Sequence, residues 1–136
     1  MKHIAKLAVL LSLAPAVTAS AGTPEEQSQQ IRTVSGVTGG VIVHLGCGDG
    51  RLTAALQERD HFVVHGLDKR SEKIDEARQH IQSTGRYGQV FVEQYDGTRL
   101  PYIDNSVNLI VVEDDYGIDR EEMKRVLAHK GVICER

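Results

Sequence analysis

The chain has 136 residues, of which 40% are hydrophobic and 26% charged, and its net charge at pH 7 is −3. These values fit one globular domain, and without a basic run they give no indication of nucleic-acid binding. No apolar run is long enough for a transmembrane helix, so we expect no membrane span in the mature chain.

The first 21 residues have the three-part layout of a secretory signal peptide. Residues 1–6 are a short basic start, residues 7–17 are apolar apart from Ser12, and residues 19–21 fit the small-residue cleavage pattern. An amphipathic first helix of the fold is the alternative, which Pro15 disfavours. We therefore expect export to the periplasm or the medium if the peptide is cleaved, and a cytoplasmic protein otherwise.

Residues 22–29 are polar and are predicted to be a linker that precedes a domain at residues 30–136. Thr23 is a plausible N-cap with Pro24 at the first helical position, which predicts a short helix within residues 27–34.

The apolar run at residues 41–45 is typical of a strand buried on both faces of a parallel sheet. Glycines follow at positions 46, 48 and 50, and then Leu52 and Leu56 recur at helical spacing. A strand, a glycine turn and a helix direct backbone N–H groups toward a nucleotide-like ligand. A plain tight turn is the alternative. Arg51 stands at the sixth position of the dinucleotide fingerprint, where a glycine is expected, and this disfavours NAD.

A second strand is predicted at residues 61–67, and Asp68 ends it, 22 residues after Gly46. This is close to the separation of about 20 residues between a glycine loop and a ribose-binding carboxylate. A helix N-cap or a solvated loop residue is the alternative for Asp68.

The rest of the chain alternates between helical and strand patterns. Helices are predicted at residues 72–82 and 120–129, and strands at residues 89–95, 107–112 and 132–134. This alternation predicts an α/β fold with a doubly wound parallel sheet.

Four segments together resemble class I S-adenosyl-L-methionine (SAM)-dependent methyltransferases of type 11/25. They are His-Leu-Gly-Cys-Gly-Asp-Gly at residues 44–50, Asp68, Asp96 with Gly97, and the Leu-Pro-Tyr block at residues 100–109. The chain also resembles the N-terminal domain of exported proteins in which a quinoprotein-like β-propeller follows. The resemblance implies a Rossmann-like sheet with strand order 3-2-1-4-5, truncated after the fifth strand. An open edge at that strand would invite self-association or a partner.

The resemblance implies a SAM site, with the glycines beside the methionine and ribose, Asp68 on the ribose hydroxyls and Asp96 near the adenine. The residues expected to bind the cofactor are His44, Gly46, Cys47, Gly48, Gly50, Asp68, Lys69, Asp96, Gly97 and Glu113. His44 stands where the family usually has an acidic residue, and a satisfied strand-end histidine is the alternative. Residues 113–116, which begin at Glu113, are expected to face the methyl group and the acceptor, and a solvated acidic turn is the alternative.

The expected function is methyl transfer from SAM to an unidentified acceptor, by this chain as an enzyme or as a fragment of one. The SAM sulfonium is already activated, so alignment supplies most of the rate and no catalytic residue can be assigned. A non-catalytic nucleotide-binding or interaction module is the alternative, and an NAD-dependent oxidoreductase is less favoured. The six histidines have no metal-ligand spacing, and Cys47 and Cys134 are expected to be free thiols.

Overall fold

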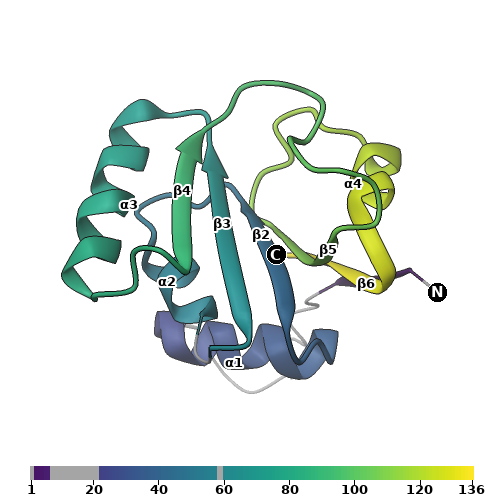
Figure 1. Cartoon of the computed structure of the whole chain (residues 1–136), viewed down its shortest axis with the longest axis horizontal. Coiled ribbons are helices and arrows are strands. Elements are labelled where there is room, and N and C mark those ends of the chain that lie inside the picture. The colour runs from purple at the N-terminus through teal and green to yellow at the C-terminus, as the bar shows by residue number, and fades with distance from the viewer. Residues whose placement is uncertain (1, 7–21, 58–59) are drawn as a thin grey trace, which may run out of the picture.

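The computed structural model describes residues 2–6, 22–57 and 60–136. Its centre is a six-stranded, all-parallel sheet in the order β1-β6-β5-β2-β3-β4 (Figure 1). The strands are β1 (His3–Lys6), β2 (Gly40–Leu45), β3 (Phe62–Asp68), β4 (Val90–Gln94), β5 (Val107–Val112) and β6 (Leu127–Glu135), and the helices are α1 (Pro24–Ser35), α2 (Arg51–Leu56), α3 (Ser71–Ser83) and α4 (Arg120–Val126). The predicted α/β class and parallel sheet are confirmed. In the described residues, no helix combines the length and apolarity that crossing a membrane requires.

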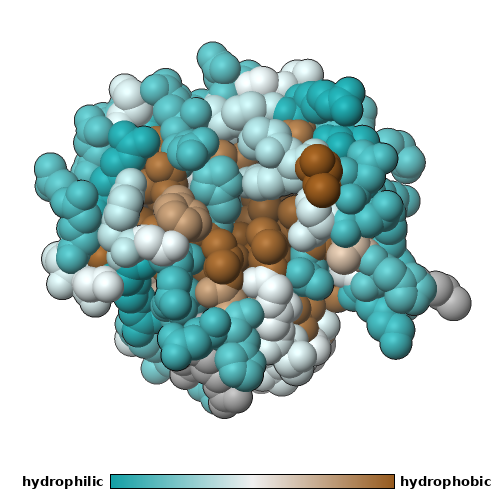
Figure 2. Space-filling model, viewed as in Figure 1, coloured by the Kyte–Doolittle hydropathy of each residue, from teal (hydrophilic) through white to brown (hydrophobic). Residues whose placement is uncertain are grey.

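Both faces of the sheet are covered, which explains the unbroken apolar run of β2. Ile42 and Val43 point to opposite faces, and neither side chain is exposed. The core on the Ile42 face packs under α1, α2 and α3. The core on the Val43 face packs under α4 and the segment before β5. This second cover is partial: Val63 on β3 is 42% exposed, and Figure 2 shows apolar side chains gathered between α3 and α4.

Helix α1 begins earlier than predicted, at Pro24. Thr23 Oγ1 accepts from the Glu26 N–H at 3.2 Å, and Glu26 Oε2 accepts from the Thr23 N–H at 3.1 Å. This reciprocal capping box, with proline at the first helical position, nucleates the helix there. The N-cap prediction is confirmed, but most of the expected linker at residues 22–29 is helix.

Helix α4 ends earlier than predicted, at Val126, although the helix was expected to continue to residue 129. Leu127 adopts an extended backbone with ψ of 132° and pairs with Val107 of β5. Its side chain is fully buried there. Sheet pairing and burial therefore override the helical pattern at this position.

The five strands predicted from the sequence lie in the predicted order, as β4-β3-β2-β5-β6. The expectation that residues 132–134 form an open sheet edge is wrong, because β1 pairs with β6 from His3 opposite Val132 onward. Lys2 Nζ also donates to the Lys124 carbonyl at 2.7 Å. Strand β1 lies inside the expected signal peptide, and the rest of that peptide, residues 1 and 7–21, lies outside the described residues.

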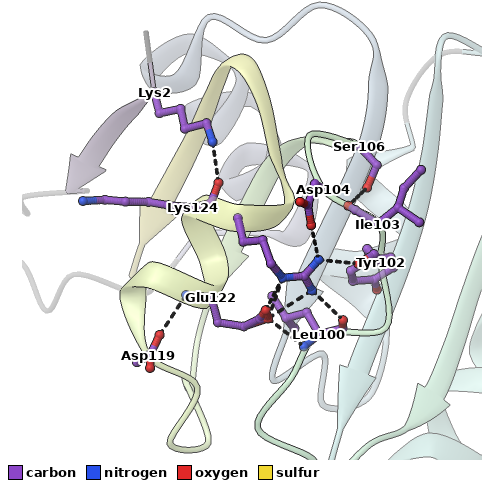
Figure 3. A network of polar contacts seen from close by, with 10 residues as sticks. Lys2, Leu100, Tyr102, Ile103, Asp104, Ser106, Asp119, Glu122 and Lys124 are labelled. Carbon is purple, nitrogen blue, oxygen red and sulfur yellow. Dashed lines mark hydrogen bonds and ion pairs between the residues drawn. The ribbon is translucent and has the colours of Figure 1, made fainter.

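Arg125 on α4 holds the segment that precedes β5, through its contacts with Leu100, Tyr102 and Asp104, which Figure 3 labels. Its guanidinium donates to the carbonyls of Leu100 at 3.1 Å and Tyr102 at 2.9 Å. It also pairs with the carboxylates of Asp104, at 2.7 Å, and Glu122. The Leu-Pro-Tyr block is thereby fixed against α4.

Candidate functional site

The sequence-predicted site residues gather at one edge of the sheet because β2 to β5 all run in the same direction (Figure 1). The glycine loop follows β2, Asp68 ends β3, Asp96 follows β4 and Glu113 follows β5. In open α/β sheets, ligands bind outside the carboxyl ends of the strands, where the strand order reverses. Here the order reverses between β2 and β5.

The glycines of the loop serve different purposes. Gly48 and Gly50 both have left-handed backbones, with φ of 57° and 79°. A Cβ added to Gly50 would lie 2.8 Å from the Ala77 Cβ, so this glycine lets α2 approach α3. A Cβ added to Gly48 would meet no atom within 4 Å. The space beside Gly48 is therefore open for a ligand to approach the backbone, which fits the nucleoside cradle that the family resemblance implies.

Asp68 is fully buried and ionised. The Gly48 N–H donates to its Oδ2 at 3.0 Å, and the Arg70 N–H donates to its Oδ1 at 2.9 Å. The Arg70 side chain adds a bidentate pair, Nε to Oδ1 and Nη2 to Oδ2, each at 3.0 Å, and the Tyr116 hydroxyl also donates to the carboxylate. Burial alone would raise the pKa of Asp68, but the hydrogen bonds from Arg70 and Gly48 lower it to about 2.

His44 is buried, and both of its ring nitrogens have partners. Nδ1 lies 2.8 Å from Thr53 Oγ1 on α2, and Nε2 lies 3.3 Å from Glu113 Oε1. Since a carboxylate only accepts, Nε2 donates to Glu113, and Thr53 Oγ1 is the partner of Nδ1. His44 therefore orients Glu113 instead of facing the open side of the loop.

Glu113 is held next to the glycine loop. A Cβ added to Gly46 would lie 3.1 Å from the Glu113 Cβ, and Arg136 Nη1 donates to Glu113 Oε1 at 2.6 Å. Burial tends to raise the pKa of the Glu113 carboxyl, but the hydrogen bond from His44 and the charge of Arg136 lower it overall. A carboxylate is thus fixed beside the start of the loop.

The remaining three residues predicted to bind the cofactor are Lys69, Asp96 and Gly97. Lys69 Nζ donates to the Tyr116 carbonyl at 3.2 Å and lies 5.2 Å from the centre of the Tyr116 ring. Asp96 is exposed in the loop after β4. A Cβ at Gly97 would lie 2.6 Å from the Tyr95 hydroxyl oxygen. The Asp96–Gly97 turn follows Tyr95, whose N–H donates to the Asp68 carbonyl at 2.9 Å, so the turn lies at the same edge of the sheet.

The two cysteines are free thiols, as predicted. Burial raises the pKa of Cys47 to about 12, so this thiol stays protonated at neutral pH. Its side chain lies where a Cβ on Gly66 would come within 2.8 Å. Cys47 therefore offers no reactive sulfur, and its backbone N–H and carbonyl are bonded to Leu67 and Gly50.

A cavity of about 560 Å³ opens beside this edge, between the end of β5, the start of α4 and the end of β6. Charged side chains dominate its lining, namely Glu113, Asp114, Asp115, Asp119, Glu135, Arg120 and Arg136. Glu113 belongs both to this cavity and to the neighbourhood of the glycine loop, so the two regions adjoin.

Three residues at this site were not predicted from the sequence: Thr53, Arg70 and Arg136. Tyr116 belongs to the segment expected to face the acceptor, but its contact with Asp68 was not predicted. Arg70 could have been found, because a cation two residues after a strand-end carboxylate can fold back onto it. Thr53 lies nine residues from His44, and no local pattern marks the pair. The contacts of Tyr116 with Asp68 and of Arg136 with Glu113 join residues from separate elements, which only the folded chain brings together.

Residues 42–131 match the methyltransferase domain family. Among solved structures, the chain is similar to a proposed SAM-dependent methyltransferase from Methanococcus maripaludis, with 25% identity, a TM-score of 0.71, and coverage of 83% of this chain and 55% of that one. Two further structures show the fold alone. One is geranyl diphosphate C-methyltransferase from Streptomyces coelicolor A3(2), with 17% identity, a TM-score of 0.69, and coverage of 80% of this chain and 44% of that one. The other is the [4+2]-cyclase SpnF, with 20% identity, a TM-score of 0.64, and coverage of 76% of this chain and 41% of that one.

The chain spans about half the length of these solved structures, and no curated protein matches it. The family match nevertheless covers well over half of the chain, from residue 42 within β2 to residue 131 within β6. It includes the glycine loop, Asp68, Asp96 and Glu113. This chain therefore belongs to the methyltransferase domain family, has the class I fold, and has SAM as its family's cofactor.

Proposed function

We propose that this domain binds SAM at the carboxyl edge of β2 to β5 and transfers its methyl group to an acceptor in the adjoining cavity. The observation that carries the proposal is the contact between the Gly48 N–H and Asp68 Oδ2 at 3.0 Å. It places a glycine loop with open space beside it next to a buried, ionised carboxylate at the end of the neighbouring strand, which is the arrangement of a nucleoside-binding site.

SAM, when bound, supplies an electrophilic methyl group on a sulfonium, so the protein needs mainly to align it. In this proposal, Asp68 accepts from the ribose hydroxyls, and the backbone at Gly46 and Gly48 approaches the cofactor closely. Glu113, oriented by His44 at 3.3 Å, places a negative charge beside the loop, where it favours a cationic ligand group.

The acceptor side of the proposal rests on the cavity of about 560 Å³. Its volume lies within the range of small-molecule pockets. Because Glu113 belongs to both regions, an acceptor in this cavity would lie next to the cofactor. A broad panel of small molecules and peptides serves to identify the acceptor.

Calorimetry of the full chain with SAM, S-adenosyl-homocysteine and NAD tests the binding step. We expect binding of the first two and none of NAD. Transfer of a tritiated methyl group to the acceptor panel then tests catalysis. NAD binding without SAM binding would replace this proposal with the oxidoreductase alternative.

A non-catalytic ligand-binding module is the second candidate. The hydrogen bonds that already engage Asp68 favour it, and the similarity to a [4+2]-cyclase indicates that the fold is not confined to methyl transfer. Tight SAM binding with no transfer to any acceptor in the panel would support this candidate.

We also propose that residues 1–21 direct export, on the layout of their basic, apolar and small-residue blocks. Residues 1–26 fused to a reporter that is active only outside the cytoplasm should give signal, with cleavage near Gly22. A cytoplasmic protein that retains Met1 would contradict this proposal.

A further inference from the structure

Asp68 has no acceptor capacity left for a ligand. A carboxylate offers about four lone-pair sites. Five donors reach Asp68: the backbone N–H groups of Gly48 and Arg70, two N–H groups of the Arg70 guanidinium, and the Tyr116 hydroxyl. The Asp68 side chain is also completely inaccessible to solvent. A ribose therefore cannot bind to Asp68 in this conformation.

The five donors divide into two groups. The two backbone N–H groups belong to the glycine loop and to the start of α3, and they stay in place whenever the fold is intact. The three side-chain donors come from Arg70 and Tyr116, and they can leave. If they leave, about two lone-pair sites become free, which equals the two hydroxyls of a ribose.

Both side chains are able to move. The Arg70 side chain is 51% exposed, and it makes no capping hydrogen bond to α3, so the guanidinium can turn into solvent. Tyr116 has a left-handed backbone with φ of 51°, which costs a non-glycine residue about 1 kcal/mol. The Tyr116 backbone is held by its N–H to Asp114 Oδ1 at 2.9 Å and by Lys69 Nζ at its carbonyl, so a rotation of the side chain alone is enough to withdraw the hydroxyl.

Resting on the SAM site proposed above, we infer that Arg70 and Tyr116 occupy the acceptor positions of Asp68 that the cofactor's ribose needs, and so lower the cofactor affinity of the free protein. The cofactor binds when the guanidinium turns outward and the Tyr116 side chain rotates off Asp68. The apparent affinity then falls with the fraction of molecules in which Asp68 is uncovered.

The test compares dissociation constants for S-adenosyl-homocysteine, measured by calorimetry on the full chain. Arg70→Ala should bind about tenfold more tightly than the parent. If Asp68 is covered in about nine of ten parent molecules, the apparent affinity of the parent is reduced by about that factor. Tyr116→Phe removes only the hydroxyl and should tighten binding by about threefold on the same arithmetic. Lys73→Ala, which removes a cation from the same helix without contacting Asp68, should leave the affinity unchanged.

Two further measurements separate the inference from the proposed function. Carbon-13 NMR of the Asp68 carboxyl should show a higher pKa in Arg70→Ala, whatever binds. The double variant Asp68→Asn with Arg70→Ala should bind no better than Asp68→Asn alone. If the parent binds and Arg70→Ala binds equally or more weakly, the inference is overturned while the SAM site stands. If no variant binds, the SAM site itself is wrong and the inference fails with it.

Discussion

The backbone N–H of Gly48 donates to Asp68 Oδ2 at 3.0 Å, and this bond joins the loop after β2 to the end of β3. Glycine gives the loop its left-handed backbone at this point, and burial of the carboxylate excludes competing water. The loop and the carboxylate therefore form one unit, so a change at either residue affects the shape of the other.

Replacing Asp68 by Ala should weaken SAM binding by at least about tenfold, or 1.4 kcal/mol. The reason is the loss of an acceptor whose hydrogen bonds, as a charged group, are worth about 1.5–3 kcal/mol each. Calorimetry measures the effect, with Asp75→Ala on the exposed face of α3 as the control. Equal affinities in the two variants would remove Asp68 from the binding site.

Asp68 should also make stability depend on pH in the acid range. Its pKa is lowered from 3.8 to about 2 by folding, so the folded state binds the proton less readily than the unfolded state. The stabilisation, about 2 kcal/mol, is complete above pH 4 and is lost as the pH falls toward 2. Urea unfolding of the parent and of Asp68→Asn should show a difference at pH 7 that shrinks toward pH 2. A constant difference would contradict the shift.

Gly50→Ala should mainly destabilise the fold, whereas Gly48→Ala should mainly weaken cofactor binding. Alanine at Gly50 meets Ala77 at 2.8 Å and also strains the backbone, which together cost about 2–4 kcal/mol of folding free energy. Alanine at Gly48 meets no atom of the described residues within 4 Å, so it should cost only about 1–2 kcal/mol of folding free energy but weaken cofactor binding strongly. Thermal unfolding and calorimetry on both variants separate the two effects. Normal cofactor affinity in Gly48→Ala would place the ligand elsewhere.

Arg125→Leu should lower the melting temperature by on the order of 5 °C. The substitution leaves Glu122 without its ion pair and the carbonyls of Leu100 and Tyr102 without their donor. Neighbouring Lys124→Leu serves as the control, since the Lys124 side chain pairs with Glu121, which is exposed. Similar melting temperatures for both variants would show that Arg125 does not hold the segment before β5.

Most of the central sheet could be predicted because its strands carry strong local patterns. The apolar run of β5 gave its bounds at Val107 and Val112 without error, and β3 ends at Asp68 as expected. The helix predicted to reach residue 129 was too long, because Leu127 obeys a helical period yet pairs with Val107 across the sheet. Strand β1 was missed for a different reason: its four residues also fit the basic start of a signal peptide.

The positions of the main residues of the candidate site could be predicted, but the side-chain contacts among them could not. The positions of Asp68 and the glycines follow from spacing along neighbouring strands. The roles of Arg70, Tyr116 and Thr53 follow from side-chain contacts between separate elements, which no single-sequence pattern specifies. His44 was expected near the ligand, and its two partners, Thr53 and Glu113, were visible only in the fold.

Removing residues 1–21 should promote self-association. The deletion takes away β1 and leaves the N–H and C=O groups along that edge of β6 unpaired, and such an edge can pair with another chain. Light scattering of the full chain and of the chain that begins at Gly22 measures the difference. A monodisperse shortened chain of equal thermal stability would show that β1 contributes nothing at this edge.

The pairing of β1 with β6 also sets an order of events during synthesis. His3 lies beside Val132, 129 residues later in the chain, so the ribosome releases the first strand long before its partner exists. A translocation machinery that takes up the N-terminus during this interval would remove β1 before the sheet could close. Export and closure of the sheet would then be competing fates of one nascent chain, decided by whether the N-terminus is captured before residue 132 is made.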